Sequence, residues 1–284
     1  MAEPIMRKAR GDGVELQVAI WEGPGKTLLC IHGLTANCRC WDLIAGTMSQ
    51  KHRVIAMDLR GRGHSGRPET GYSIDQHCRD IIRLMDDLGL ETVIPVGHSL
   101  GASIALALGA RHPDRVDRMV LLDGAGKLSK EQMIRVFAGI KPALDRLGKI
   151  FPSFEAYIDL LKKAPFLQPW SPNLETYFRY EVESVDGGVG SRVQPEHIAE
   201  ESLNMKDVDV AQLYRDIACP VLILRATEGM LAQDDILLPQ EAVDRMLKEI
   251  PDARYIDILG TNHYSIIFQP NGVRDQAMLD FLDA

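Results

Sequence analysis

The feature that most constrains the fold is an alternation of short, continuous apolar runs with helical patterns. An unbroken apolar run of strand length is typical of a strand that is buried on both faces. Between two of these runs, residues 73–88 repeat apolar side chains at helical spacing. Strands that alternate with helices predict right-handed βαβ units and a mostly parallel sheet, so the expected class is α/β. The six apolar runs are residues 27–31, 53–57, 92–96, 118–122, 221–224 and 254–258.

The alternation is interrupted once, between the runs at 118–122 and 221–224. The interval contains many large apolar residues, which argues against a disordered linker, and its pattern is that of helices joined by loops. We therefore predict a core domain of residues 1–127 and 210–284 and an inserted helical cap of residues 128–209. The cap is expected over the carboxyl ends of the strands, where α/β sheets bind their ligands.

Residues 14–21 have a different pattern, in which apolar and polar side chains alternate. Such alternation is typical of a half-buried strand, and half-buried strands belong to antiparallel sheets. We expect this segment to form an antiparallel strand at the edge of the sheet.

A Gly-x-Ser-x-Gly motif lies where one apolar run meets a helical run. It reads Gly-His-Ser-Leu-Gly at 97–101, directly after the run at 92–96 and before a series of small apolar residues. This strand–turn–helix context is the one that a nucleophile elbow requires, because the serine must project from a sharp, strained turn. Gly97 and Gly101 carry no Cβ, so strand and helix can close around the turn. The positive end of the helix then faces any anion that forms at Ser99.

A serine hydroxyl is a poor nucleophile and needs an adjacent base that is itself oriented by a carboxylate. In elbow-type hydrolases the chain order is nucleophile, acid, histidine, so the histidine is expected late, in a loop after a strand. His263 is the last of the eight histidines and follows the apolar run at 254–258. We predict Ser99 as the nucleophile and His263 as the general base.

An oxyanion hole needs two backbone N–H groups. The residue after the nucleophile, Leu100, supplies one of them. The other is expected from the loop after an early strand, and His32-Gly33 follows the run at 27–31. Glycine lets the backbone turn back towards the elbow, so we predict Leu34 as the second donor.

Four motifs together resemble the α/β-hydrolase fold superfamily. They are His32-Gly33, the segment Asp-Leu-Arg-Gly-Arg-Gly-His-Ser at 58–65, the elbow at 97–101 and Asn262-His263, and they occur in the family's order. The resemblance covers essentially the whole chain. It implies an eight-stranded, twisted, mostly parallel sheet flanked by helices, with a helical cap. It also implies that the 58–65 loop is a structural turn, so we assign Asp58 no catalytic role.

The position of the triad acid is left open. Family members carry this acid after either of two strands. Asp123 ends one of them, at a separation from Ser99 similar to that in relatives that use this strand. The commoner place follows the run at 221–224, where the family's aspartate is replaced by Gly229 and a longer loop would offer Asp235 instead. In order of preference the candidates are Asp123, Asp235, and then Asp234 or Glu228.

The resemblance implies a serine hydrolase that cleaves small carboxylic esters or lactones through an acyl-serine. Relatives with the same groups cleave amides or C–C bonds next to a carbonyl, and some bind a ligand with slow turnover, so these alternatives remain. Epoxide hydrolases and haloalkane dehalogenases use an aspartate where this chain has Ser99. No metal and no organic cofactor are expected.

The substrate pocket is expected between the sheet loops and the cap. We predict that it is lined by Gly33, Trp41, His98, Trp170 and Tyr264. Four basic residues of the cap are weaker candidates for binding a substrate carboxylate, because most cap cations are simply solvated. They are Arg135, Lys141, Arg146 and Arg179.

The composition excludes other kinds of partner. The net charge of −8 argues against nucleic acids and anionic membranes, and no apolar run is long enough to span a bilayer. The five cysteines, an odd number without zinc-like spacing, fit reduced thiols in a cytoplasm. We expect a small-molecule partner with an ester or related carbonyl group, and a monomer or homodimer.

Overall fold

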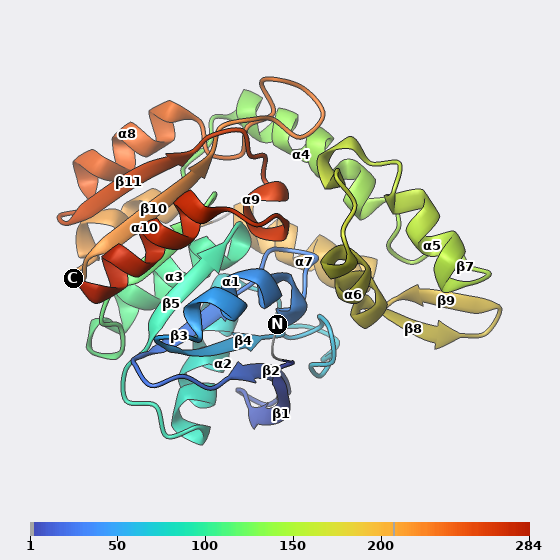
Figure 1. Cartoon of the computed structure of the whole chain (residues 1–284), viewed down its shortest axis with the longest axis horizontal. Coiled ribbons are helices and arrows are strands. Elements are labelled where there is room, and N and C mark those ends of the chain that lie inside the picture. The colour runs from blue at the N-terminus through green and yellow to red at the C-terminus, as the bar shows by residue number, and fades with distance from the viewer. Residues whose placement is uncertain (1–2, 207) are drawn as a thin grey trace.

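The computed structural model describes residues 3–206 and 208–284. Its centre is an eight-stranded sheet in the order β1-β2-β4-β3-β5-β6-β10-β11 (Figure 1). The α/β fold predicted from the sequence is therefore confirmed. The strands are β1 Ile5–Arg10, β2 Glu15–Trp21, β3 Thr27–Ile31, β4 Arg53–Met57, β5 Ile94–His98, β6 Met119–Leu122, β10 Val221–Ala226 and β11 Ala253–Ile258.

All neighbours from β4 to β11 pair in parallel, whereas β1–β2 and β2–β4 are antiparallel. The segment at 14–21 is thus antiparallel as predicted, but the prediction that it lies at the edge is wrong. β1 covers its outer side, and six of the seven residues of β2 are buried. The exposed β1 carries little apolar signal of its own, which is why the sequence did not show it.

Helices cover both faces of the sheet (Figure 1). Buried side chains of α1 and α10 belong to one hydrophobic cluster, and those of α2, α3 and α8 belong to the other. The sheet is therefore buried on both faces, as its continuous apolar strands require. The α-helices outside the inserted segment are α1 Asp42–Met48, α2 Ile74–Asp87, α3 Leu100–Arg111, α8 Gln240–Glu249, α9 Ser265–Phe268 and α10 Gly272–Asp283.

The chain between β6 and β10 folds outside the main sheet (Figure 1). It contains helices, as expected, but the expectation of helices and loops alone is wrong. Three short strands form a separate antiparallel sheet in the order β7-β9-β8, and a turn at 186–187 closes its β8–β9 hairpin. The elements are α4 Lys130–Leu144, β7 Ile150–Phe151, α5 Phe154–Leu161, α6 Pro172–Glu181, β8 Val182–Val185, β9 Gly188–Ser191 and α7 Pro195–Lys206.

Candidate active site

Ser99 lies in the sharp turn between β5 and α3. Its backbone has φ 58° and ψ −121°, a conformation that costs a non-glycine residue energy and persists only where the surroundings hold it. The Ser99 N–H donates to the carbonyl of Leu122 at 3.2 Å, and the Ala102 N–H donates to the Ser99 carbonyl at 3.0 Å. The strain and the hydrogen bonds that hold it are those expected of a nucleophile elbow.

Three glycines allow the chain to close around this turn. A Cβ on Gly97 would lie 2.2 Å from the carbonyl oxygen of Gly101, and one on Gly101 would lie 2.0 Å from that of Ile31. A Cβ on Gly124 would lie 2.6 Å from the carbonyl oxygen of Ser99. Any larger residue at these positions would push β3, β5 and α3 apart, so the glycines set the place of Ser99.

His263 and Asp123 meet although 140 residues separate them in the chain. The Nδ1–H of His263 donates to Oδ2 of Asp123 at 2.7 Å, and both side chains are buried. The second carboxylate oxygen, Oδ1, accepts the N–H of Ala226 at 3.2 Å. This contact places the proton on Nδ1 and leaves Nε2 of the imidazole free to accept a proton from a nucleophile.

The other acid candidates lie elsewhere. Asp235 is buried, but its carboxylate accepts backbone N–H groups of its own loop, from Met230 at 2.6 Å and Leu231 at 2.8 Å. Asp234 pairs with a surface arginine of α4, and Glu228 is exposed. The preferred candidate, Asp123, is therefore the carboxylate that the structure places on His263, and Asp235 holds a loop.

His98 packs directly against His263. Their rings stack with centroids 4.4 Å apart, and the Nε2–H of His98 donates to the His263 carbonyl at 2.9 Å. Burial lowers the pKa of His98 well below its usual value, and a charge on His263 lowers it further. His98 therefore stays neutral and supports the loop that carries His263.

The two predicted oxyanion donors flank Ser99. Leu100 begins α3, so its N–H has no partner within the helix. Leu34 follows Gly33, and a Cβ on Gly33 would lie 3.1 Å from Cβ of Ser99. The loop that carries Leu34 thus runs against Ser99, and both Leu34 and Leu100 line the same cavity as Ser99 and His263.

Two buried side chains hold this loop, and the sequence did not single out either role. His32 donates from Nδ1 to the Gly33 carbonyl at 2.8 Å and accepts the Leu59 N–H on Nε2 at 3.0 Å. Burial lowers the pKa of His32 to about 3, so the ring keeps this neutral form. Arg62 donates from Nε to the Leu34 carbonyl at 3.0 Å. The contacts of His32 with Leu59 and of Arg62 with Leu34 join residues that are distant in the sequence, so no local pattern reveals them.

A cavity of about 510 Å³ opens on Ser99 and His263. Its other walls come from α4, α7, the loop after β6 and the loop after β11, and most of them are apolar. Of the predicted pocket residues, Gly33, His98 and Tyr264 line it. Burial raises the pKa of Tyr264 to about 12, so its hydroxyl keeps its proton.

The predictions for the two tryptophans are wrong. Trp41 is fully buried in the hydrophobic cluster beneath α1 and does not reach the cavity. Trp170 stacks on Phe178 with ring centroids 5.7 Å apart and borders a separate surface depression. Both rings are used for packing, which is the commoner fate of a large aromatic side chain.

The four basic residues of the inserted segment all have acidic partners. Arg146 is buried and pairs with Glu181 at 2.8 Å, and the other three form exposed ion pairs. None of the four lines the cavity. Among the described residues, the charged ones that line it besides the histidines are Lys127, Lys206 and Asp209, of which Lys127 and Asp209 pair with each other.

The described ranges, 3–206 and 208–284, contain no group of three or more His, Cys, Asp or Glu side chains placed to hold a metal ion. Within the same ranges, no helix combines the length and apolar character needed to cross a membrane.

A family model described as alpha/beta hydrolase fold matches residues 26–270. The chain belongs to the α/β-hydrolase family. The match spans the elbow, Asp123 and His263 together with the whole inserted segment. The family resemblance expected from the four motifs is thus confirmed.

Individual relatives share this fold and are named as hydrolases. The chain is 28% identical over 269 residues to 2-(acetamidomethylene)succinate hydrolase of Mesorhizobium japonicum, covering 93% of this chain and 90% of that protein. A crystal structure of E-2-(acetamidomethylene)succinate hydrolase superposes with a TM-score of 0.85 at 26% identity, covering 99% of this chain and 100% of that one. A shorter match, 39% identical over 108 residues, covers 37% of this chain and 38% of 2-hydroxymuconate semialdehyde hydrolase of a Pseudomonas species. By these matches the chain is a hydrolase.

Proposed function

We propose that this protein is a serine hydrolase that cleaves a small carboxylic amide through an acyl-Ser99 intermediate and cleaves the corresponding esters with the same groups. The observation that carries the proposal is the 2.7 Å contact between His263 Nδ1 and Asp123 Oδ2. It orients an imidazole on the wall of a cavity that also exposes Ser99 and the two oxyanion loops. This is the arrangement that acyl transfer to serine requires.

The reaction follows from the roles of these groups. His263 Nε2 takes the proton of the Ser99 hydroxyl as Oγ attacks the carbonyl carbon, and the N–H groups of Leu34 and Leu100 bind the oxyanion. Asp123 stabilises the imidazolium that forms. The imidazolium then protonates the leaving nitrogen or oxygen, the tetrahedral intermediate collapses, and the first product departs. Water, deprotonated by His263, attacks the acyl-Ser99 carbonyl, and the acid is released.

The relatives favour a C–N bond as the scissile bond. One relative, which matches 93% of this chain, is named for a substrate with an acetamido group, and a solved structure named for the same substrate superposes over nearly the whole chain. Our expectation from the sequence was ester cleavage. Esters are intrinsically more reactive than amides and need no different groups, so an amide-cleaving site of this kind is expected to accept them as well.

The walls of the cavity favour an apolar substrate arm next to the scissile carbonyl. The described lining includes the apolar residues Leu100, Val136 and Ile140, and of its two lysines Lys127 is already paired with Asp209. Because an unpaired charge in an apolar pocket is costly, we expect a charged group of the substrate only where it can reach Lys206, the other lysine of the lining.

The proposal is tested with matched substrates that share one acyl chain and differ in the leaving group. We expect wild-type protein to hydrolyse both p-nitrophenyl esters and p-nitroanilides of short acyl chains, and Ser99→Ala to lose both activities while it keeps a native circular dichroism spectrum. Hydrolysis of esters without any hydrolysis of anilides would favour an esterase. Saturable binding without turnover of either series would favour the receptor alternative.

A further inference from the structure

A buried ionic cluster lies outside the cavity and is not used by the mechanism above. Arg62 is fully buried, and its Nη2 donates to Oε2 of Glu201 at 2.9 Å. The same carboxylate oxygen lies 2.8 Å from Nε2 of His77 in α2. Burial by itself would raise the pKa of Glu201, but His77 and Arg62 lower it to about 2. Glu201 therefore carries a charge at any ordinary pH.

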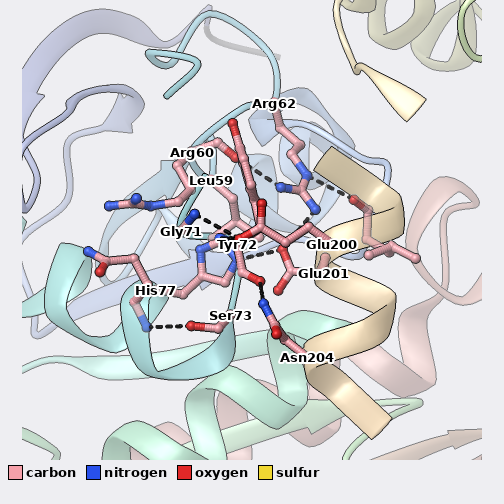
Figure 2. Close-up of polar contacts among 12 residues, drawn as sticks. Leu59, Arg60, Arg62, Gly71, Tyr72, Ser73, His77, Glu200, Glu201 and Asn204 are labelled. Atoms are coloured by element: carbon pink, nitrogen blue, oxygen red, sulfur yellow. Dashed lines mark hydrogen bonds and ion pairs between the residues drawn. The ribbon is translucent and has the colours of Figure 1, made fainter. Parts of the chain in front are cut away.

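This cluster joins α7 to the core (Figure 2). Glu201 is one of three α7 side chains that bind the core loop before α2. Glu200 accepts the N–H groups of Gly71 and Tyr72 at 2.8 and 3.1 Å, and Asn204 donates to the Tyr72 carbonyl at 2.7 Å. Positions 200, 201 and 204 share one face of the helix, so these polar contacts come from one side of α7. His197 of the same helix also stacks on Tyr72, with ring centroids 4.3 Å apart.

Arg62 also connects this docked helix to the loop of the candidate oxyanion hole. Its Nε donates to the Leu34 carbonyl at 3.0 Å, and its Nη1 donates to the Arg60 carbonyl at 3.0 Å. One rigid guanidinium thus spans Leu34, its own loop and Glu201. The N–H that we assign to the oxyanion belongs to Leu34 itself, so the orientation of that residue's backbone decides where the N–H points.

We infer that Arg62, anchored by Glu201 of α7, is a positioning residue that fixes the Leu34 backbone for oxyanion binding. The inference rests on the proposed function, because it assigns work to the oxyanion hole of that same site. Other faces of α7 contribute Ser202, Met205 and Lys206 to the wall of the cavity. The position of α7 therefore affects the wall of the cavity directly, and it affects the loop of Leu34 through the buried contact between Glu201 and Arg62.

The neighbouring pair Arg60–Asp80 supplies a matched control. This pair is also buried and Arg60 belongs to the same loop as Arg62, although its contact is bidentate, with both guanidinium nitrogens 2.6 Å from the carboxylate. Arg60 donates to Asp80 and to the Asp12 carbonyl, not to the loop of Leu34. Replacing either pair by apolar residues removes the two charges of the pair together. In the first pair it also removes the carboxylate partner of His77 Nε2.

The test compares Arg62→Met/Glu201→Leu with Arg60→Met/Asp80→Leu. For the first pair we expect kcat on p-nitrophenyl esters to fall about tenfold or more, with KM changed less than about twofold, because a misplaced donor weakens only the transition state. For the control pair we expect kcat and KM within about twofold of wild type. Arg62→Lys keeps a cation opposite Glu201 without the guanidinium fork, and we expect it to lower kcat in the same way if the double variant fails to fold.

A second readout separates oxyanion binding from general stability. An alkyl trifluoromethyl ketone becomes a tetrahedral oxyanion on Ser99, whereas the methyl ketone of the same chain binds as a ground-state carbonyl. We expect the Arg62 variants to bind the trifluoromethyl ketone about tenfold more weakly than wild type does, and to bind the methyl ketone with an affinity within about twofold of wild type. Folded Arg62 variants that keep the wild-type kcat and preference for the trifluoromethyl ketone would overturn the inference. If the wild-type protein neither turns over the esters nor binds the trifluoromethyl ketone more tightly than the methyl ketone, the proposed function itself is overturned.

Discussion

The replacement of Asp123 by Asn tests the candidate triad with almost no change in shape. In the native site Oδ2 accepts His263 Nδ1–H and Oδ1 accepts the Ala226 N–H. An amide has one oxygen and one NH₂ group, so it cannot accept both protons. If its oxygen faces the Ala226 N–H, its NH₂ faces Nδ1, which turns the imidazole to the tautomer with the proton on Nε2. That imidazole cannot accept the proton of Ser99.

We expect Asp123→Asn to lower kcat by about 10⁴-fold, which corresponds to about 5.5 kcal/mol of transition-state stabilisation. The fold should persist, because asparagine tolerates the positive φ of 43° at this position. The assay is hydrolysis of a p-nitrophenyl ester, with kcat and KM measured separately and a urea titration to confirm folding.

The control is Asp235→Asn. Its carboxylate accepts the N–H groups of Met230 and Leu231, so the variant should lose about 1–3 kcal/mol of stability and keep kcat within about threefold. The reasoning is refuted if Asp123→Asn keeps a tenth or more of the activity (about 1.4 kcal/mol or less). It is refuted equally if Asp235→Asn is the variant that becomes inactive while folded.

Three further variants test the packing of the elbow, the burial of His98 and the size of the cavity. Gly101→Ala places a Cβ 2.0 Å from the Ile31 carbonyl, so urea denaturation should show a loss of about 3 kcal/mol or more; a stable variant would contradict the packing argument. Below about pH 6.5 the unfolded state protonates His98 before the folded state does, so stability falls by up to about 1.4 kcal/mol per pH unit as pH decreases. His98→Asn should reduce this dependence of the free energy of unfolding on pH, and an unchanged dependence would contradict a buried, neutral His98. Ile140→Trp narrows the cavity, so kcat/KM should fall for long acyl chains and persist for acetyl esters; an equal loss for both would place Ile140 elsewhere.

Much of the fold was predictable because it depends on local sequence. The apolar runs identified β3, β4, β5, β6, β10 and β11, and the helical spacing of residues 73–88 identified α2, which spans Ile74–Asp87. Five of the six residues of β1 are exposed, so its sequence shows no apolar face. The strands β7, β8 and β9 are too short to show a period of alternating apolar residues.

The site was predictable only where its residues lie within a motif or a fixed chain order. Ser99 and His263 could be named in this way. The choice between Asp123 and Asp235 could not be settled, because it depends on which carboxylate lies within reach of His263 in three dimensions. The contact of Arg62 with Glu201 joins residues 139 positions apart, and its meaning appears only when α7 is placed against the core. Nothing in the sequence around Trp41 distinguishes a residue that lines the pocket from one that packs in the core.

Covalent labelling shows whether Ser99 is an activated nucleophile. A fluorophosphonate reacts with an activated serine and stays attached, so peptide mass spectrometry identifies the modified residue. We expect one label per chain on the peptide that contains Ser99, none in Ser99→Ala, and strongly slowed labelling in folded Asp123→Asn. Absence of label on folded wild-type protein, or a label that persists in Ser99→Ala, would contradict this role of Ser99.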